Sequence, residues 1–428
     1  MADVAAGGAT DRRLVRDIVW VLASFVIAGL GAVAVNSYIA RTLGAPALGV
    51  FNQAFAVYIV LSQVAVGGLQ FSVLQQISAS RGDLRRSGEA ASSALILVAM
   101  VSAAICLLTW ALSGRIGSML GGDAVAIAIR LMLPGLFCYS LNKVLLYVLN
   151  GLRHMRAYSV FQSLRFVLIL AAIAILVAAG RPGEELTLSL TAGEIILLIA
   201  MSTYLGACKF PFRIGPHLRS WYRIHISYGL RGFLSGVFHE VNTRVDILLL
   251  GHFCDNATVG IYSFAAILAE GFAQIPLAVR TNVDPIVGHH LAAGQLEQLQ
   301  AFSKKIRSRF FPLMLALAAV SIAIYPLLLR VLRLDPSFHA SWAVFGILAA
   351  AIALNARMRP FLGILLQAGR PGVHTLLVAI VVTTNAALNL AFIPFFGATG
   401  AACGTAVAFL VEAILIAVLS RRLLKIRL

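Results

Sequence analysis

Runs of apolar residues long enough to cross a lipid bilayer follow one another along almost the whole chain. A spanning helix needs about 20 such residues, because the hydrocarbon core of a bilayer is about 30 Å thick. Turn residues and charged residues separate the runs, so an all-α integral membrane protein with about 12 transmembrane helices is predicted. The expected spans are roughly 17–40, 46–70, 90–112, 124–149, 158–179, 186–207, 228–251, 258–281, 307–330, 340–367, 372–394 and 398–419.

The composition and the placement of charge agree with a membrane protein. Of the 428 residues, 60% are hydrophobic and 12% are charged, whereas soluble domains are roughly 25% charged. The net charge of +17 could indicate a nucleic-acid partner, but 21 of the 34 Lys and Arg residues fall on one side of the expected spans and 5 on the other. Cytoplasmic loops carry such an excess. Both termini are therefore expected to be cytoplasmic, and no nucleic acid is expected as a partner.

Eight basic side chains lie inside the expected spans, with only five acids to balance them. A charge at the centre of a bilayer costs at least a few kcal/mol, so such groups usually pair with an opposite charge or face a water-filled cavity. The surplus of positive charge favours a cavity for an anionic substrate. The basic residues are Arg130, Lys143, Arg165, Arg231, Arg244, Arg280, Arg357 and Arg359, and the acids are Glu194, Glu240, Asp246, Glu270 and Glu412.

Four of the eight bases have an alternative explanation. Arg130, Arg165 and Arg280 lie close enough to a membrane surface to reach lipid headgroups. Arg244 follows Glu240 by four residues, the favourable order for an ion pair on one helix. Candidate anion ligands are therefore Lys143, Arg231, Arg357 and Arg359.

Arg359 is the first candidate among these, because guanidinium binds phosphate and carboxylate through two parallel hydrogen bonds. Asn355 lies four residues earlier and shares its helix face, while Arg357 points away. Pro360 removes a backbone donor and allows the helix to bend at this depth.

A polar stripe on the second span forms another candidate set. Asn52, Gln63 and Gln70 fall within about 20° of one another on a helix. A shift of 211 residues places Ser263, Gln274 and Thr281 at the equivalent positions of the eighth span. A stripe kept in both halves favours a cavity wall, and hydrogen bonding between packed helices is the alternative.

Glu270 and Asp246 are the candidates for ion coupling, with H+ or Na+ as the ion. A carboxyl group deep in a membrane favours its neutral form, so proton uptake and release could accompany each change of access. An ion pair between Glu270 and one of the surplus arginines is the alternative.

Two sequence echoes indicate an internal repeat. The stretch Leu43–Phe51 reappears at Leu250–Tyr262 with Gly49 on Gly260, and Leu149–Arg153 reappears at Leu366–Arg370. We expect two pseudo-symmetric six-helix bundles around a central cavity, at 1–208 and 228–428. Transporters built from such repeats bind substrate between the halves. The segment 209–227 is expected to be a cytoplasmic linker on anionic headgroups, or a regulatory segment.

Enzyme signatures are missing from the sequence. It has no glycine-rich phosphate loop, no Ser/His/Asp order and no metal-ligand spacing among its cysteines. The chain is expected to act without catalysis, cofactor or metal.

Three short stretches resemble the lipid-linked oligosaccharide and O-antigen flippases of the multidrug/oligosaccharidyl-lipid/polysaccharide exporter superfamily. They are Asn36…Ile39-Ala40-Arg41-Thr42-Leu43-Gly44…Leu48-Gly49-Val50-Phe51, Asp246-Ile247…Leu250-Gly251…Val259-Gly260-Ile261-Tyr262…Ala265 and Leu388-Asn389…Ile393-Pro394…Gly397-Ala398-Thr399-Gly400-Ala401-Ala402. The resemblance covers essentially the whole chain. It implies a polyprenyl-pyrophosphate-linked oligosaccharide moved from the cytoplasmic to the outer leaflet, and a multi-pass protein of the bacterial inner membrane.

The leading hypothesis is therefore a flippase for surface polysaccharide assembly, covering O-antigen, capsule or exopolysaccharide. Membrane lipid and other polysaccharide-assembly membrane proteins are further expected partners. An ion-coupled multidrug exporter of the same architecture is the alternative, although a cavity for cationic drugs should be negative. A membrane-embedded glycan polymerase or ligase is the alternative of another class, although it would need a large outer loop with catalytic residues.

Overall fold

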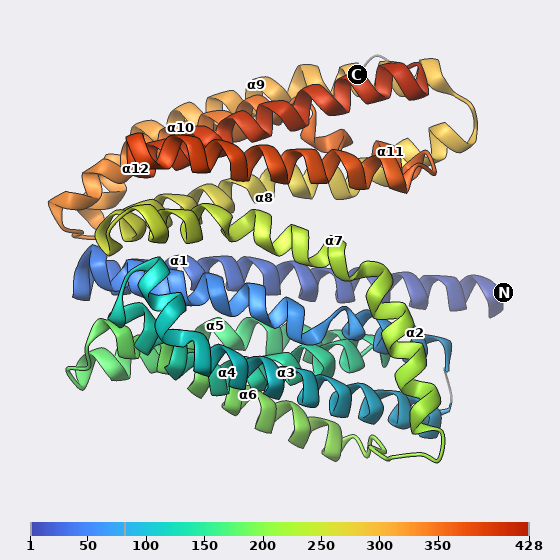
Figure 1. The fold of residues 1–428 in the computed structure, drawn as a ribbon. Helices are drawn as coiled ribbons and strands as arrows, with labels where there is room; N and C mark the ends of the chain where they lie inside the picture. The colour runs from blue at the N-terminus through green and yellow to red at the C-terminus, as the bar shows by residue number, and fades with distance from the viewer. Residues whose placement is uncertain (1, 81–82, 427–428) are drawn as a thin grey trace. The chain divides into compact units, whose positions relative to one another are not determined.

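The structure is a computed structural model that describes residues 2–80 and 83–426, and within these every side chain except those of 2–15, 18, 231, 232, 234, 235 and 239. Helices fill almost all of the described chain (Figure 1), which contains no strand. The α-helices are α1 (Ala2–Val66), α2 (Leu69–Ala79), α3 (Leu84–Leu120), α4 (Asp123–Gly151), α5 (Met155–Ala178), α6 (Leu188–Ala207), α7 (Leu218–Phe253), α8 (Asn256–Ala292), α9 (Leu296–Val331), α10 (Ser341–Asn355), α11 (Ile364–Gln367) and α12 (Pro371–Leu424). The short 3-10 helices are η1 (Gly183–Thr187), η2 (Pro336–Ala340) and η3 (Arg359–Phe361).

Among the described residues, nine helices are long and apolar enough to cross a membrane. Two of them, α1 and α12, are too long for one crossing and are interrupted at Gly44, with φ 79°, and at Gly397, with φ 53°. A positive φ is the conformation that glycine adopts most easily, and α12 doubles back in Figure 1. The more polar helix α7 is 36 residues long. The expected multi-pass all-α membrane fold is thus confirmed.

The chain divides into two compact units, one of Met1–Ile39 with Gln53–Glu240 and the other of Ala40–Asn52 with Val241–Leu428. Each unit has its own apolar core: side chains such as Val98, Leu149 and Met201 form the first, and Phe361 and Leu377 belong to the second. The bundle boundaries expected from the sequence stay a prediction, as does the cytoplasmic location of the termini.

Small residues let helices of the first unit approach closely, as in many membrane bundles. A Cβ on Gly135 of α4 would lie 2.8 Å from the backbone of Thr191 on α6. Pro134 lacks an N–H group, and the Thr191 hydroxyl donates to the Leu131 carbonyl at 2.8 Å and accepts from the Gly135 N–H at 3.1 Å. The interrupted backbone of α4 is therefore tied to α6.

In the second unit, the two glycines that align in the sequence repeat lie against each other. A Cβ on Gly49 would overlap the carbonyl oxygen of Asn256, and a Cβ on Gly260 would overlap that of Ala45. Only glycine permits this approach of the two backbones.

Two expected spans are broken in the structure. The span 46–70 is interrupted at Gly67 and Gly68, which both have positive φ. Gln70 therefore does not continue the helix of Asn52, and the expectation that both lie on one helix face is wrong. The span 340–367 ends as a regular α-helix at Asn355 and continues as η3 and α11, since Pro360 cannot maintain the hydrogen-bond ladder.

Candidate functional site

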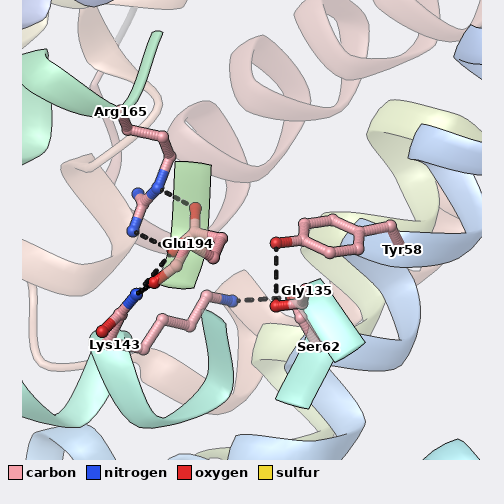
Figure 2. Close-up of polar contacts among 7 residues, drawn as sticks. Tyr58, Ser62, Gly135, Lys143, Arg165 and Glu194 are labelled. Carbon is pink, nitrogen blue, oxygen red and sulfur yellow. Dashed lines mark hydrogen bonds and ion pairs between the residues drawn. The ribbon is translucent and has the colours of Figure 1, made fainter. Parts of the chain in front are cut away.

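A buried ion pair joins two helices of the first unit (Figure 2), between Glu194 on α6 and Arg165 on α5. Arg165 donates from Nε to Oε1 at 2.6 Å and from Nη2 to Oε2 at 3.5 Å. Asn142 on α4 donates to Oε2 of the same carboxylate at 2.8 Å. The side chains of Glu194 and Arg165 are 1% and 13% exposed, so a fixed set of donors replaces water around this carboxylate.

Lys143 follows Asn142 on α4 and is held by uncharged groups (Figure 2). Its Nζ donates to the Ser62 hydroxyl at 3.1 Å and to Gln63 Oε1 at 3.5 Å, and lies 4.9 Å from the centre of the Tyr139 ring. Among the described side chains, no carboxylate oxygen lies within ion-pair distance of Nζ. The ammonium group is therefore held by dipoles and a π face without a direct ion pair, while the charges of Glu240 and Glu194 act on it from farther away.

Aromatic residues form one side of this cluster. The Tyr139 ring also lies 4.5 Å from the Arg165 guanidinium carbon and stacks on Tyr58 at 5.0 Å between centroids. The Tyr58 hydroxyl donates to the Gly135 carbonyl at 3.4 Å (Figure 2). One ring thus contacts both cations and fixes their positions relative to Tyr58.

The second unit contains a related group around Glu412 of α12. Asn355 Nδ2 and Arg359 Nη1 both lie 2.7 Å from Glu412 Oε2. The Arg359 guanidinium lies 5.5 Å from the Phe409 ring, and its side chain is 30% exposed. Arg357 points away from this group, is exposed, and lies 6.0 Å from the Phe311 ring.

Two further carboxylates of the second unit are the expected ion-coupling residues. Glu270 of α8 forms an ion pair with Arg244 of α7 at 3.2 Å. An ion pair was the alternative for this acid, but with a surplus arginine, whereas Glu240 was the partner expected for Arg244. Asp246 accepts from the Tyr262 hydroxyl and from the Ile247 N–H. A coupling role for either residue stays a prediction.

The remaining candidate ligands lie at separate places. Asn52 is buried and donates to the Leu48 carbonyl of its own helix at 3.1 Å, while Gln70 is buried. Gln274 is exposed and donates to the Glu270 carbonyl at 3.5 Å. The side chain of Arg231 lies outside the described residues.

Sequence reasoning missed the two groups that converge on Glu194 and Glu412. Arg165 was expected to reach headgroups but instead bonds Glu194, because a 29-residue separation hides the pairing from any helical periodicity. The available signal was the presence of these acids in apolar spans, where a partner is required. The described residues hold no cluster of His, Cys, Asp and Glu that could bind a metal ion.

Solved membrane transporters share this fold across nearly the whole chain. An inward-facing multidrug resistance MATE family transporter of the MOP superfamily superposes with a TM-score of 0.78 at 16% identity, covering 92% of this chain and 93% of that one. The lipid II flippase MurJ in an inward closed conformation superposes with a TM-score of 0.76 at 13% identity, covering 93% of this chain and 86% of that one. The chain therefore has the fold of these multi-pass transporters.

Comparison of the sequence with protein families identifies the family of the chain. Residues 14–274 match the polysaccharide biosynthesis protein family, and the chain belongs to this family. It is 27% identical over 387 residues to the probable low-salt glycan biosynthesis flippase Agl15 of Haloferax volcanii, over 89% of this chain and 77% of that protein. The resemblance to the exporter superfamily of oligosaccharide flippases is thereby confirmed.

Proposed function

We propose that this protein is a flippase for a polyprenyl-pyrophosphate-linked oligosaccharide. It moves the glycan from the cytoplasmic to the outer leaflet by alternating access, and so supplies surface polysaccharide assembly such as O-antigen, capsule or exopolysaccharide. Membership of the polysaccharide biosynthesis family supports this class, as do a relative named as a glycan biosynthesis flippase and the fold shared with a lipid II flippase. These relationships favour a transporter over a membrane-embedded polymerase or ligase.

The surroundings of Lys143 are the observation that best supports an anionic substrate. An ammonium group in an apolar span costs a few kcal/mol unless a counter-charge or water offsets it. The partners of Lys143 are a hydroxyl, an amide oxygen and an aromatic ring. A pyrophosphate would supply a direct ion-pair partner, in addition to the more distant charges of Glu240 and Glu194. Arg165 and Arg359 are already matched by Glu194 and Glu412.

The test is flipping of a labelled polyprenyl-pyrophosphate saccharide in proteoliposomes. We expect Lys143→Gln to reduce the flipping rate about tenfold or more, equivalent to at least about 1.4 kcal/mol of lost interaction. The matched control is Lys305→Gln, since Lys305 is an exposed lysine of α9. Wild-type protein that moves no glycan donor but exports the cation ethidium would overturn the flippase in favour of the drug exporter.

Ion coupling forms a second part of the proposal, with H+ or Na+ exchanged at Asp246 or Glu270. A carboxyl group inside a span favours its neutral form, and contact with water on one side of the membrane would let it release the proton. The flipping assay is therefore repeated with an imposed pH or sodium gradient. We expect the gradient to accelerate wild-type protein and to leave Asp246→Asn unchanged. Equal acceleration of both would remove Asp246 from the coupling.

A further inference from the structure

A cavity of about 300 Å³ lies in the first unit, away from the Glu194 and Lys143 cluster. The beginning of the apolar part of α1, the turn between α4 and α5, and one residue of α6 line it. Its charged lining is mostly cationic: it contains Arg16, Arg153 and Arg156, with Asp17 as the acid, and His154 lies beside them. The volume lies at the lower end of the range for small-molecule sites, which is about 300–1,000 Å³.

Aromatic residues fix two of the lining side chains in position. Arg156 lies 5.1 Å from the centre of the Trp20 ring, which holds its guanidinium group in place by a cation–π contact. His154 Nδ1 lies 3.2 Å from the Tyr204 hydroxyl, so the imidazole is fixed to α6. Guanidinium groups bind phosphate oxygens through paired hydrogen bonds.

Arg153 occupies a backbone position that normally selects glycine. Its φ is 59°, and the N–H groups of Arg153 and His154 close the end of α4 by donating to Asn150 and Leu149. The corresponding turn at the end of α11 has Gly369 at that position, with φ 69°. An L-residue in this conformation costs about 1–2 kcal/mol. Lys209 and Arg333 close other helices in the same turn, with φ 53° and 54°, so the conformation places the Arg153 side chain at the cavity but does not by itself assign it a function.

The position of the cavity indicates a lipid. Trp20 marks the start of the first span, and the next turns of α1 expose Leu22, Val26 and Leu30 along one side. Tryptophan is typical of the membrane–water interface. A phosphate held by the three arginines would thus leave its hydrocarbon chain beside an apolar helix surface.

Asp17 adds a second requirement. Its Oδ2 is buried and bonds no described group, so a ligand should present a hydroxyl or ammonium donor close to its phosphate. We propose that this cavity binds the phosphate-ester headgroup of a membrane lipid, at the membrane end predicted to be cytoplasmic. The site is separate from the transport site and does not depend on the proposed function.

The test measures the thermal stability of the purified full chain with dioctanoyl phosphatidylglycerol, dioctanoyl phosphatidylcholine, farnesyl pyrophosphate and inorganic pyrophosphate. We expect a lipid phosphate to raise the melting temperature of wild-type protein by several degrees. The phosphatidylcholine headgroup lacks the donor for Asp17 and should have less effect. Farnesyl pyrophosphate also lacks this donor, so a larger effect of phosphatidylglycerol identifies a bilayer phospholipid as the source. The reverse order would identify a prenyl phosphate and would remove the requirement set by Asp17.

The variants locate the effect. The lipid-induced rise in melting temperature should be smaller in Arg153→Gln and in Arg156→Gln than in wild type. It should be smallest in the triple variant that adds Arg16→Gln. Arg219→Gln, at an exposed arginine of α7, should keep the shift with every lipid. Lys143→Gln, at the proposed transport site, should keep the shift with phosphatidylglycerol. The proposal is overturned if no lipid phosphate stabilises the wild type, if the arginine variants respond like the wild type, or if inorganic pyrophosphate acts as strongly as the lipids.

Discussion

Each unit contains one carboxylate that receives an arginine and an asparagine, but the two groups differ in how completely the charges are enclosed. In the first unit, Arg165 contacts both oxygens of Glu194, and these side chains are 13% and 1% exposed. In the second unit, both donors contact the same oxygen of Glu412, and Arg359 is 30% exposed. The same residue types thus form a closed structural pair in one unit and a more accessible one in the other.

The two groups therefore differ in whether the intramembrane charge serves stability alone or is also accessible to a ligand. A fully enclosed pair contributes to stability only while both partners are present, because either charge alone is strongly unfavourable. A partly exposed arginine can exchange its carboxylate for another anion. Among the matched cations, Arg359 is therefore better placed than Arg165 to contact a substrate.

The largest effect is expected for Glu194→Gln, which leaves the Arg165 charge enclosed without its counter-ion. Removal of one partner of a buried pair costs about 3–5 kcal/mol. Thermal unfolding in detergent should show a large fall in melting temperature, with reduced yield of folded protein. The double variant Arg165→Met with Glu194→Leu should recover much of the loss. A wild-type melting temperature for Glu194→Gln would contradict the enclosure of this pair.

A smaller effect is expected for Glu412→Gln in the second unit. A hydrogen bond to a charged group contributes about 1.5–3 kcal/mol, and the exposed part of Arg359 can be solvated after the change. The same unfolding measurement should place this variant between wild type and Glu194→Gln. A loss equal to or larger than that of Glu194→Gln would remove the distinction between the two groups.

His225 is a buried titratable residue outside the expected spans. The effect of pH on its charge can be compared with the effect of removing the carboxylate of Glu194 or Glu412. Its ring nitrogens lie 2.8 Å from the Ser72 hydroxyl and 3.1 Å from the Ser93 hydroxyl, and burial lowers the pKa of His225 to about 4. As the pH falls from about 6.5 to about 4, the unfolded chain binds this proton while the folded chain does not. Folded protein should therefore lose stability over this window.

This pH dependence is measured as the melting temperature between pH 7.5 and pH 4.5. We expect a steeper fall for wild type than for His225→Asn, whereas Glu412→Gln should keep the wild-type slope. Identical slopes for wild type and His225→Asn would mean that another group controls the acid response.

The smallest effect is expected at the helix-ending turns, where the first unit has Arg153 and the second has Gly369. Arg153→Gly removes an unfavourable positive φ and should stabilise the protein by up to about 1 kcal/mol. The converse change, Gly369→Arg, should destabilise it by a similar amount. These shifts are measured in the absence of added lipid. A loss of stability in Arg153→Gly would mean that its side chain contributes to folding.

The sequence predicted the architecture and some local geometry but not the pairings. Asn355 and Arg359 were placed on one helix face by their spacing of four residues, and both do reach Glu412. The α-helix ends at Asn355 and Arg359 begins η3, so the two side chains meet at Glu412 although α-helical periodicity does not continue between them. Glu412 itself lies on another helix 53 residues from Arg359, and such a contact depends on tertiary packing. The polar stripe through Gln70 failed for a related reason, since Gly67 and Gly68 interrupt the helix.

The two pairs also differ in how the chain can enter the membrane. Arg165 and Glu194 lie on helices joined by the short segment 179–187, so both charges can enter the bilayer together as one hairpin. A single Arg or Asp at a helix centre raises the insertion free energy by about 2.5–3.5 kcal/mol. Arg359 meets Glu412 only after the first half of α12 has been made and the chain has turned at Gly397. During synthesis the second unit must therefore hold an unmatched arginine for longer, and its insertion should depend more on the translocation machinery than that of the first.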